Sequence, residues 1–113
     1  MTDPSAIAAI IEQYEKHGWK LRRVLLPREA IDELSETAIF GDAEVRPSGQ
    51  GGLWFSRRTQ PDREAWELRR VSASPFAIVE VIPDGHTDQE REEALAHAEA
   101  RMFDTSRPKE TSH

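Results

Sequence analysis

The sequence predicts a single α+β domain in which an antiparallel sheet of four to five strands forms a meander. Helical patterns occupy the two ends of the chain, and short strand-like runs separated by Gly, Pro, Ser and Asp fill residues 40–82. Such short links favour antiparallel hairpins over β-α-β units. At 113 residues the chain can bury one core. We expect two layers, with the N-terminal and C-terminal helices packed on the sheet and a short helix at one edge.

The first helix is predicted to begin at Asp3 and Pro4 and to end near His17. Asp accepts a hydrogen bond from a free N–H at a helix start, and Pro fits the first turn because it lacks an N–H there. Gly18 can close the helix in a left-handed conformation. Its apolar face has helical spacing and consists of Ile7, Ile10, Ile11 and Tyr14.

An amphipathic strand is predicted next, over residues 19–26, where apolar residues alternate with Lys20, Arg22 and Arg23. Pro27 then opens a second, shorter helix. Its narrow apolar stripe consists of Ile31, Leu34 and Ala38.

Four further strands are predicted at residues 43–46, 53–57, 65–71 and 76–82. The first of them has the weakest strand pattern. Turn residues separate the last three, because Pro presets φ and Asp or Ser can bond the backbone nearby. These turn pairs are Pro61 with Asp62 and Ser74 with Pro75.

The last helix is predicted from Thr87 onward. Thr87 and Glu90 have the spacing of a capping box, in which each side chain bonds the backbone N–H of the other residue. Arg91, Leu95, Ala98 and Met102 share one face of this helix. We place the domain at residues 1–103 and expect residues 104–113 to form a disordered polar tail.

The strand ending at Ile82 is apolar on both sides, since Ala77, Val79 and Val81 alternate with Phe76, Ile78 and Ile82. This pattern predicts a central strand covered on both faces. The alternative is an exposed patch of Trp54 and Ile78 that receives a partner. Alternation also predicts that the arginines divide between the two faces.

Composition favours a soluble protein of the reducing cytoplasm. There is no cysteine, which excludes disulfides, thiolate metal sites and cysteine nucleophiles. The longest apolar run, residues 6–11, is too short to span a membrane, and no basic region precedes an apolar stretch as in a secretory signal.

The net charge of −6 disfavours nucleic acid as a partner, although the charge is unevenly distributed. Residues 46–71 carry six arginines against three acids, whereas residues 80–104 carry eight acids against two arginines. We expect an arginine-bearing sheet and an acidic last helix.

One short segment has residue types that a divalent metal accepts: Asp84, His86 and Asp88. Turn formation and helix capping explain most of this segment without a metal. The sequence therefore predicts no metal site and no cofactor, and a metal-dependent or small-ligand enzyme centred on His86 stays the third hypothesis.

The sequence contains no catalytic constellation, so the first hypothesis is a non-enzymatic accessory or protein-interaction module, with self-association as one form. The opposite charges of the sheet and the last helix support it. The second hypothesis is single-stranded nucleic-acid binding through Trp54, Arg58 and Arg69, which are expected on the face away from Leu53 and Phe55.

Overall fold

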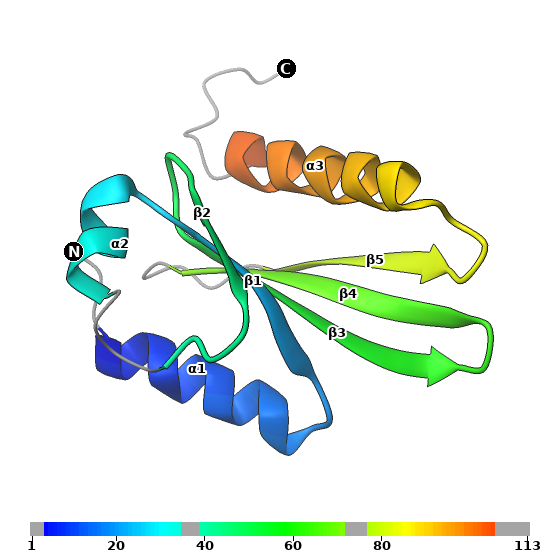
Figure 1. Cartoon of the computed structure of the whole chain (residues 1–113), viewed down its shortest axis with the longest axis horizontal. Helices are drawn as coiled ribbons and strands as arrows, with labels where there is room; N and C mark the ends of the chain where they lie inside the picture. The colour runs from blue at the N-terminus through cyan, green and yellow to red at the C-terminus, as the bar shows by residue number, and fades with distance from the viewer. Residues whose placement is uncertain (1–3, 35–38, 72–76, 106–113) are drawn as a thin grey trace.

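The computed structural model describes residues 4–34, 39–71 and 77–105. The described part is an α+β fold, as predicted (Figure 1). Its elements are α1 (Pro4–Lys16), β1 (Lys20–Leu26), α2 (Arg28–Leu34), β2 (Glu44–Pro47), β3 (Gly52–Gln60), β4 (Arg63–Arg70), β5 (Ala77–Pro83) and α3 (Asp88–Thr105). None of the described helices combines the length and apolar character needed to cross a membrane.

The strands form one sheet in the order β2-β1-β3-β4-β5. The predicted hairpins are confirmed, because β3 pairs antiparallel with β4 and β4 pairs antiparallel with β5. The purely antiparallel meander is wrong, since β2 pairs parallel with β1, with Val45 beside Val24. The chain crosses through α2 between these strands, and such a crossover lets the second strand run in the same direction as the first.

The fold has three layers where two were expected. Figure 1 shows α1 and α3 on opposite sides of the sheet. The first core lies on the α1 side and contains Ile7, Ile11, Leu21, Val24, Leu26, Ala30, Leu34, Leu53 and Phe55. The second lies on the α3 side and contains Leu25, Trp54, Trp66, Leu68, Ile78, Ile82, Leu95, Ala98 and Met102. Successive residues of a strand point to opposite faces, so a strand with consecutive apolar residues needs cover on both.

The central strand is β3, in which residues 52–56 are all buried. The prediction of a central, doubly covered last strand is wrong, because β5 is an edge strand. Ile78 and Ile82 are buried under α3, whereas Val79 and Val81 are 53% and 52% exposed on the other face. After β5 the chain turns into α3, so no later described strand extends the sheet beyond it.

The predicted end of α1 and the predicted start of α3 are confirmed. Gly18 follows α1 with a φ of 87°. Thr87 Oγ1 accepts from Glu90 N at 3.1 Å, and Glu90 Oε1 accepts from Thr87 N at 2.8 Å, which completes the capping box. Helix α3 runs to Thr105, two residues past the expected domain boundary.

Several predicted features lie outside the described residues. They are the helix-starting Asp3, the stripe residue Ala38, the turn at Ser74 and Pro75, the strand residue Phe76, and residues 106–113 of the predicted tail.

Candidate interaction surface

A β-bulge directs two arginines of β1 to the α3 side of the sheet. Leu21 pairs with Phe55 and Arg23 pairs with Trp54, so Arg22 is an extra residue in the ladder. Arg22 Nη1 donates to Ser56 Oγ at 2.9 Å, and its guanidinium lies 4.6 Å from the Trp66 ring centroid. Because the extra residue resets the alternation, both arginines face α3.

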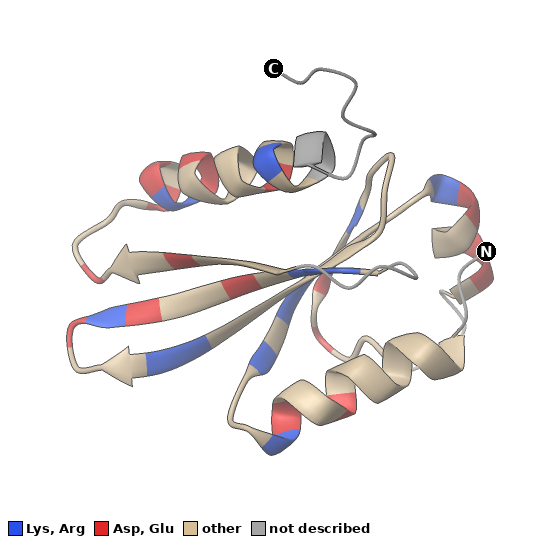
Figure 2. Cartoon of the chain, turned by 180° about the vertical axis from the view of Figure 1, so that it is seen from behind, with Lys and Arg blue, Asp and Glu red and all other residues tan. Residues whose placement is uncertain are grey.

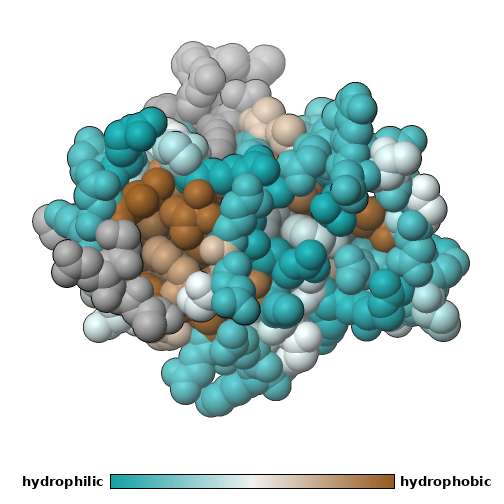
Figure 3. Space-filling model, in the orientation of Figure 1, coloured by the Kyte–Doolittle hydropathy of each residue, from teal (hydrophilic) through white to brown (hydrophobic). Residues whose placement is uncertain are grey.

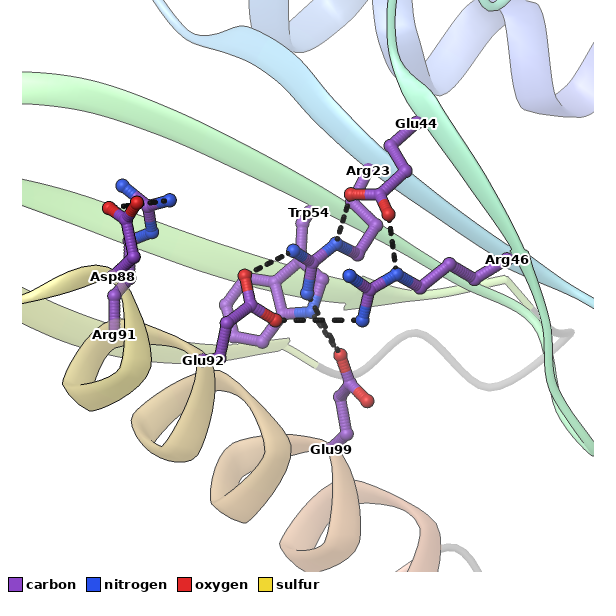
Figure 4. Close-up of polar contacts among 8 residues, drawn as sticks. All are labelled: Arg23, Glu44, Arg46, Trp54, Asp88, Arg91, Glu92 and Glu99. Atoms are coloured by element: carbon purple, nitrogen blue, oxygen red, sulfur yellow. Dashed lines mark hydrogen bonds and ion pairs between the residues drawn. The ribbon is translucent and has the colours of Figure 1, made fainter.

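Arg23 is buried between the sheet and α3, where three glutamates surround it (Figure 4). Its Nη2 donates to Glu92 Oε2 at 2.7 Å and its Nε to Glu44 Oε1 at 3.2 Å. Its Nη1 lies 4.0 Å from Glu99 Oε2. The hydrogen bond that Arg23 Nη2 donates to Glu92 lowers the pKa of Glu92 below its ordinary value.

Arg46 of β2 extends this ionic cluster. Its Nε donates to Glu44 Oε2 at 2.7 Å, and its Nη1 lies 3.5 Å from Glu92 Oε1. The hydrogen bond from Arg46 is the largest cause of the lowered pKa of Glu44. Figure 2 shows the acidic positions along α3 and the basic positions along β1. Arg46 is the member of the arginine-rich segment 46–71 that pairs with α3 in this cluster, and Arg23 of β1 supplies the second positive charge.

Trp54 and Ile78 do not form an exposed patch. Trp54 is fully buried, and its Nε1 donates to Glu99 Oε2 of α3 at 2.8 Å. The ring packs edge-on against Trp66, with centroids 6.2 Å apart. Ile78 is 8% exposed and belongs to the same core. Helix α3 covers this face, so the alternative of an exposed Trp54 and Ile78 patch is wrong.

Arg58 and Arg69 lie on opposite faces. Arg58 pairs across the strands with Glu64 on the α3 side, whereas Arg69 pairs with Leu53 on the α1 side. The prediction that Arg69 shares a face with Trp54 is wrong, because the register sets Trp54 opposite Leu68. The predicted division of the arginines between the two faces is confirmed.

The three metal candidates do not converge. Asp84 forms two hydrogen bonds with Arg58, at 3.1 and 3.2 Å, so an arginine occupies both carboxylate oxygens. His86 is exposed in a turn, where its backbone N donates to Pro83 O. Asp88 lies 3.6 Å from Arg91 Nη2. Among the described residues, no group of three or more His, Asp or Glu side chains could hold a metal ion.

The open face lies on the α1 side of β5 and the adjoining part of β4, where α1 contacts β4 through Tyr14 and Glu67 and leaves Val79 and Val81 of β5 exposed. We define it as Ala65, Glu67, Arg69, Ala77, Val79 and Val81. The register sets Val81 opposite Ala65, Val79 opposite Glu67 and Ala77 opposite Arg69. Val79 and Val81 are among the few large hydrophobic residues that the described part exposes.

Tyr14 marks the boundary between the first core and the open face. Its ring stacks on Phe55 with centroids 4.0 Å apart, and its hydroxyl donates to Glu67 Oε2. Burial, followed by the hydrogen bond and charge of Glu67, raises the pKa of Tyr14 to about 12, and Arg69 opposes this shift. Tyr14 and Glu67 therefore hold the end of α1 against β4.

A second apolar area appears between α1 and α2 in Figure 3. Partly buried side chains that pack against the first core include Ile10, Ile31, Ile39 and Phe40. We regard this apolar area as the outer part of that core. The open face is different, because Val79 and Val81 belong to neither core.

Sequence reasoning missed the exposure of Val79 and Val81, although it identified the side they share with Ala77. The useful signal was their place in the chain. They lie in the last strand before a helix that the pattern Leu95, Ala98 and Met102 predicts to cover one face, and one helix cannot cover both faces of that strand.

No protein family and no solved structure matches this chain. Among curated proteins, it is similar to the pre-rRNA-processing protein IPI3 of Scheffersomyces stipitis, with 29% identity over 77 residues. The matched part covers 68% of this chain and 15% of that protein.

Proposed function

We propose that this chain is a non-enzymatic protein-interaction module that binds its partner along β5, through the open face and the outer edge of that strand. The observation that carries the proposal is the exposure of Val79 and Val81 on an edge strand. Natural edge strands are usually protected by short length, charge, Pro or bulges. The other edge, β2, has this protection, with four exposed residues that include Glu44, Arg46 and Pro47.

The outer edge of β5 offers backbone groups as well as side chains. Asp84 N donates to Asp62 O, and the register then makes Ile82, Glu80 and Ile78 the residues that bond to β4. Ala77, Val79 and Val81 therefore direct their N–H and C=O groups away from the sheet. The backbone of Pro83 also points away from β4. Its missing N–H therefore removes no hydrogen bond from the sheet.

The one charged residue in the middle of β5 does not guard this edge. The Glu80 side chain lies on the α3 side, 3.8 Å from Arg101 Nη1. An incoming strand would meet an apolar row on the open face and a backbone edge beside which the described residues place no strand. These are the features by which an extended segment adds to a sheet edge.

The opposite charges of the sheet and the last helix do not point to an external partner. Arg23 and Arg46 of the sheet pair with Glu92 of α3 within the same chain, and Arg23 also pairs with Glu44. The proposal depends on β5 instead. The absence of cysteine fits a reducing compartment, and we propose the cytoplasm as the location.

Amide shift mapping of the isotope-labelled chain in cell lysate tests the proposal. We expect perturbed signals at Ala77, Val79 and Val81, and we expect Val79→Lys to abolish them. Val45→Lys is the matched control, since Val45 is also exposed on an edge strand, at the opposite side of the sheet. Perturbation confined to other elements would refute this role for β5, as would β5 amides that stay unshifted both in lysate and across a concentration series of the pure chain.

The second candidate function is binding of single-stranded RNA, which the likeness to a pre-rRNA-processing protein favours. The side chains offer little support, because Trp54 and Trp66 are buried and Arg58 is paired with Asp84. Titration of a labelled single strand at two salt concentrations tests this candidate. Affinity that falls with added salt would support it, and no binding at low salt would exclude it.

A further inference from the structure

We infer that the partner of β5 is a second copy of this chain. Two β5 strands would pair antiparallel around a two-fold axis at Val79 and join the two five-stranded sheets into one. This inference rests on the proposed function, because it requires the edge of β5 to be a binding site. It specifies the occupant and the register.

The register follows from the backbone. With Val79 opposite Val79 of the second copy, Ala77 lies opposite that copy's Val81 and Val81 opposite its Ala77. All of these residues direct their N–H and C=O groups outward. Each opposed pair can exchange two hydrogen bonds, as in a regular antiparallel ladder.

Charge repulsion disfavours the register that is shifted by two residues toward the C-terminus. A two-residue shift toward the C-terminus sets Glu80 opposite Glu80 of the second copy, and like charges directly opposite one another are destabilising. In the Val79-centred register, Glu80 lies opposite Ile78 of the other copy and keeps Arg101 of its own chain.

The hydrogen-bond ladder disfavours two further registers. A one-residue shift sets Val79 opposite Glu80, whose backbone groups already face β4. A two-residue shift toward the N-terminus leaves Val81 of each copy beyond Ala77 of the other copy, where β5 begins. Val81 then has no partner in the other β5 strand, and its hydrogen-bonded pairs are lost. Of the four registers compared, the Val79-centred one keeps Ala77, Val79 and Val81 all paired and opposes no like charges.

The same geometry joins the two apolar rows. A two-fold axis perpendicular to the sheet leaves both open faces on the same side, so Ala77, Val79 and Val81 of the two copies form one strip. Contact between two single strands is small, at the low end of specific interfaces and below about 1,200 Å². We therefore expect a dissociation constant of roughly micromolar or weaker.

Sedimentation velocity tests the pairing from about 0.1 µM to about 1 mM, a range that extends below and above a micromolar dissociation constant. We expect the pure chain to shift from monomer to dimer, and Val79→Lys to weaken the dimer at least about tenfold by opposing two lysines. Val45→Lys should dimerise like the parent, and circular dichroism checks that both variants fold. A strict monomer at every concentration would overturn the inference.

Disulfide trapping tests the register, since the chain has no native cysteine. Directly opposed residues have Cα atoms about 5.5 Å apart, within the range that a disulfide spans. Mild oxidation should link Val79→Cys into a dimer and should also link a mixture of Ala77→Cys and Val81→Cys. Val81→Cys alone should not link, because its copies lie roughly 13 Å apart along the strands.

Equal cross-linking of Val79→Cys and Val81→Cys would overturn the register. The two proposals fail differently. A monomeric pure chain whose β5 amides shift in lysate refutes the second copy and leaves the interaction module intact, whereas unshifted β5 amides under both conditions refute both.

Discussion

Arg23 Nη2 of β1 lies 2.7 Å from Glu92 Oε2 of α3, and this contact joins the sheet to the helix that covers its second face. The Arg23 side chain is 7% exposed, while that of Glu92 is 37% exposed. Arg23 therefore has its charge neutralised by glutamates that keep contact with water. The pair fixes α3 over Trp54, which is hydrogen-bonded to the same helix through Glu99.

Replacing Arg23 with Met should lower the free energy of unfolding by about 1–3 kcal/mol. Removing one partner of a buried ion pair costs about 3–5 kcal/mol, and we reduce this value because the glutamates are partly solvated. Urea denaturation followed by circular dichroism measures the change. Arg63→Met is the control, since Arg63 pairs with Asp62 in solvent and should leave the urea midpoint unchanged. Equal midpoints for both variants would contradict this role of Arg23.

Acid should weaken the contact between α3 and the sheet. The pKa of Glu92 lies below its ordinary value of 4.5 in the folded protein, chiefly because Arg23 donates to its carboxylate. This pair therefore contributes stability above pH 4.5, and the contribution is lost as the pH falls through the lowered pKa.

Glu92→Gln tests that loss by comparison with the parent in urea at about pH 7 and about pH 3. The variant should be less stable than the parent at the higher pH, and the difference should shrink at the lower one. If the difference in stability between the variant and the parent stays constant or grows in acid, the Glu92 carboxylate is not its source.

Tyr14 should ionise near pH 12, as its pKa is raised from 10.0 mainly by burial. Because the folded pKa is the higher one, this stabilisation is complete below pH 10 and is lost as the pH rises through 12. Tyr14 is the only tyrosine, so tyrosinate absorbance reports it alone.

Glu67→Gln should move the absorbance transition of Tyr14 toward lower pH, because it removes a negative charge that opposes ionisation. The shift should be partial, since burial of Tyr14 remains. The chain unfolded in urea provides the reference near pH 10. An unchanged midpoint in Glu67→Gln would contradict the contact between Tyr14 and Glu67, and a midpoint in the folded parent equal to that reference would contradict the burial of Tyr14.

Thr87→Ala should destabilise the chain by about 1 kcal/mol, the usual cost of losing an N-cap side chain. The lost hydrogen bond is the one that Thr87 Oγ1 accepts from Glu90 N. Thermal unfolding measures the effect, with Gln89→Ala as the neighbouring control. If the two variants melt alike, the capping box does not stabilise α3.

Local chemistry allowed the elements themselves to be predicted. Helical spacing located α1 and the buried face of α3, Gly18 marked the end of α1, and Thr87 with Glu90 marked the start of α3. These signals depend on residues within a few positions of one another, so the sequence contains them without knowledge of the fold.

Strand order lay beyond such local signals. Nothing in the four residues of β2 indicates that they pair parallel with β1, and the apolar pattern of β5 fits a central strand as well as an edge strand covered on one side. The bulge that turns Arg22 and Arg23 to the same face is likewise a property of the pair β1 and β3.

The sequence by itself determined the α+β class, the end of α1, the start of α3 and the division of arginines between two faces. Only the tertiary structure decided that β5 is an edge strand, that Arg23 is paired with Glu92, and that Val79 and Val81 face outward. The physical reason is the separation in sequence of the residues that interact. Periodicity and capping relate residues within one or two helical turns, whereas strand order and ion pairing depend on residues that are far apart in sequence.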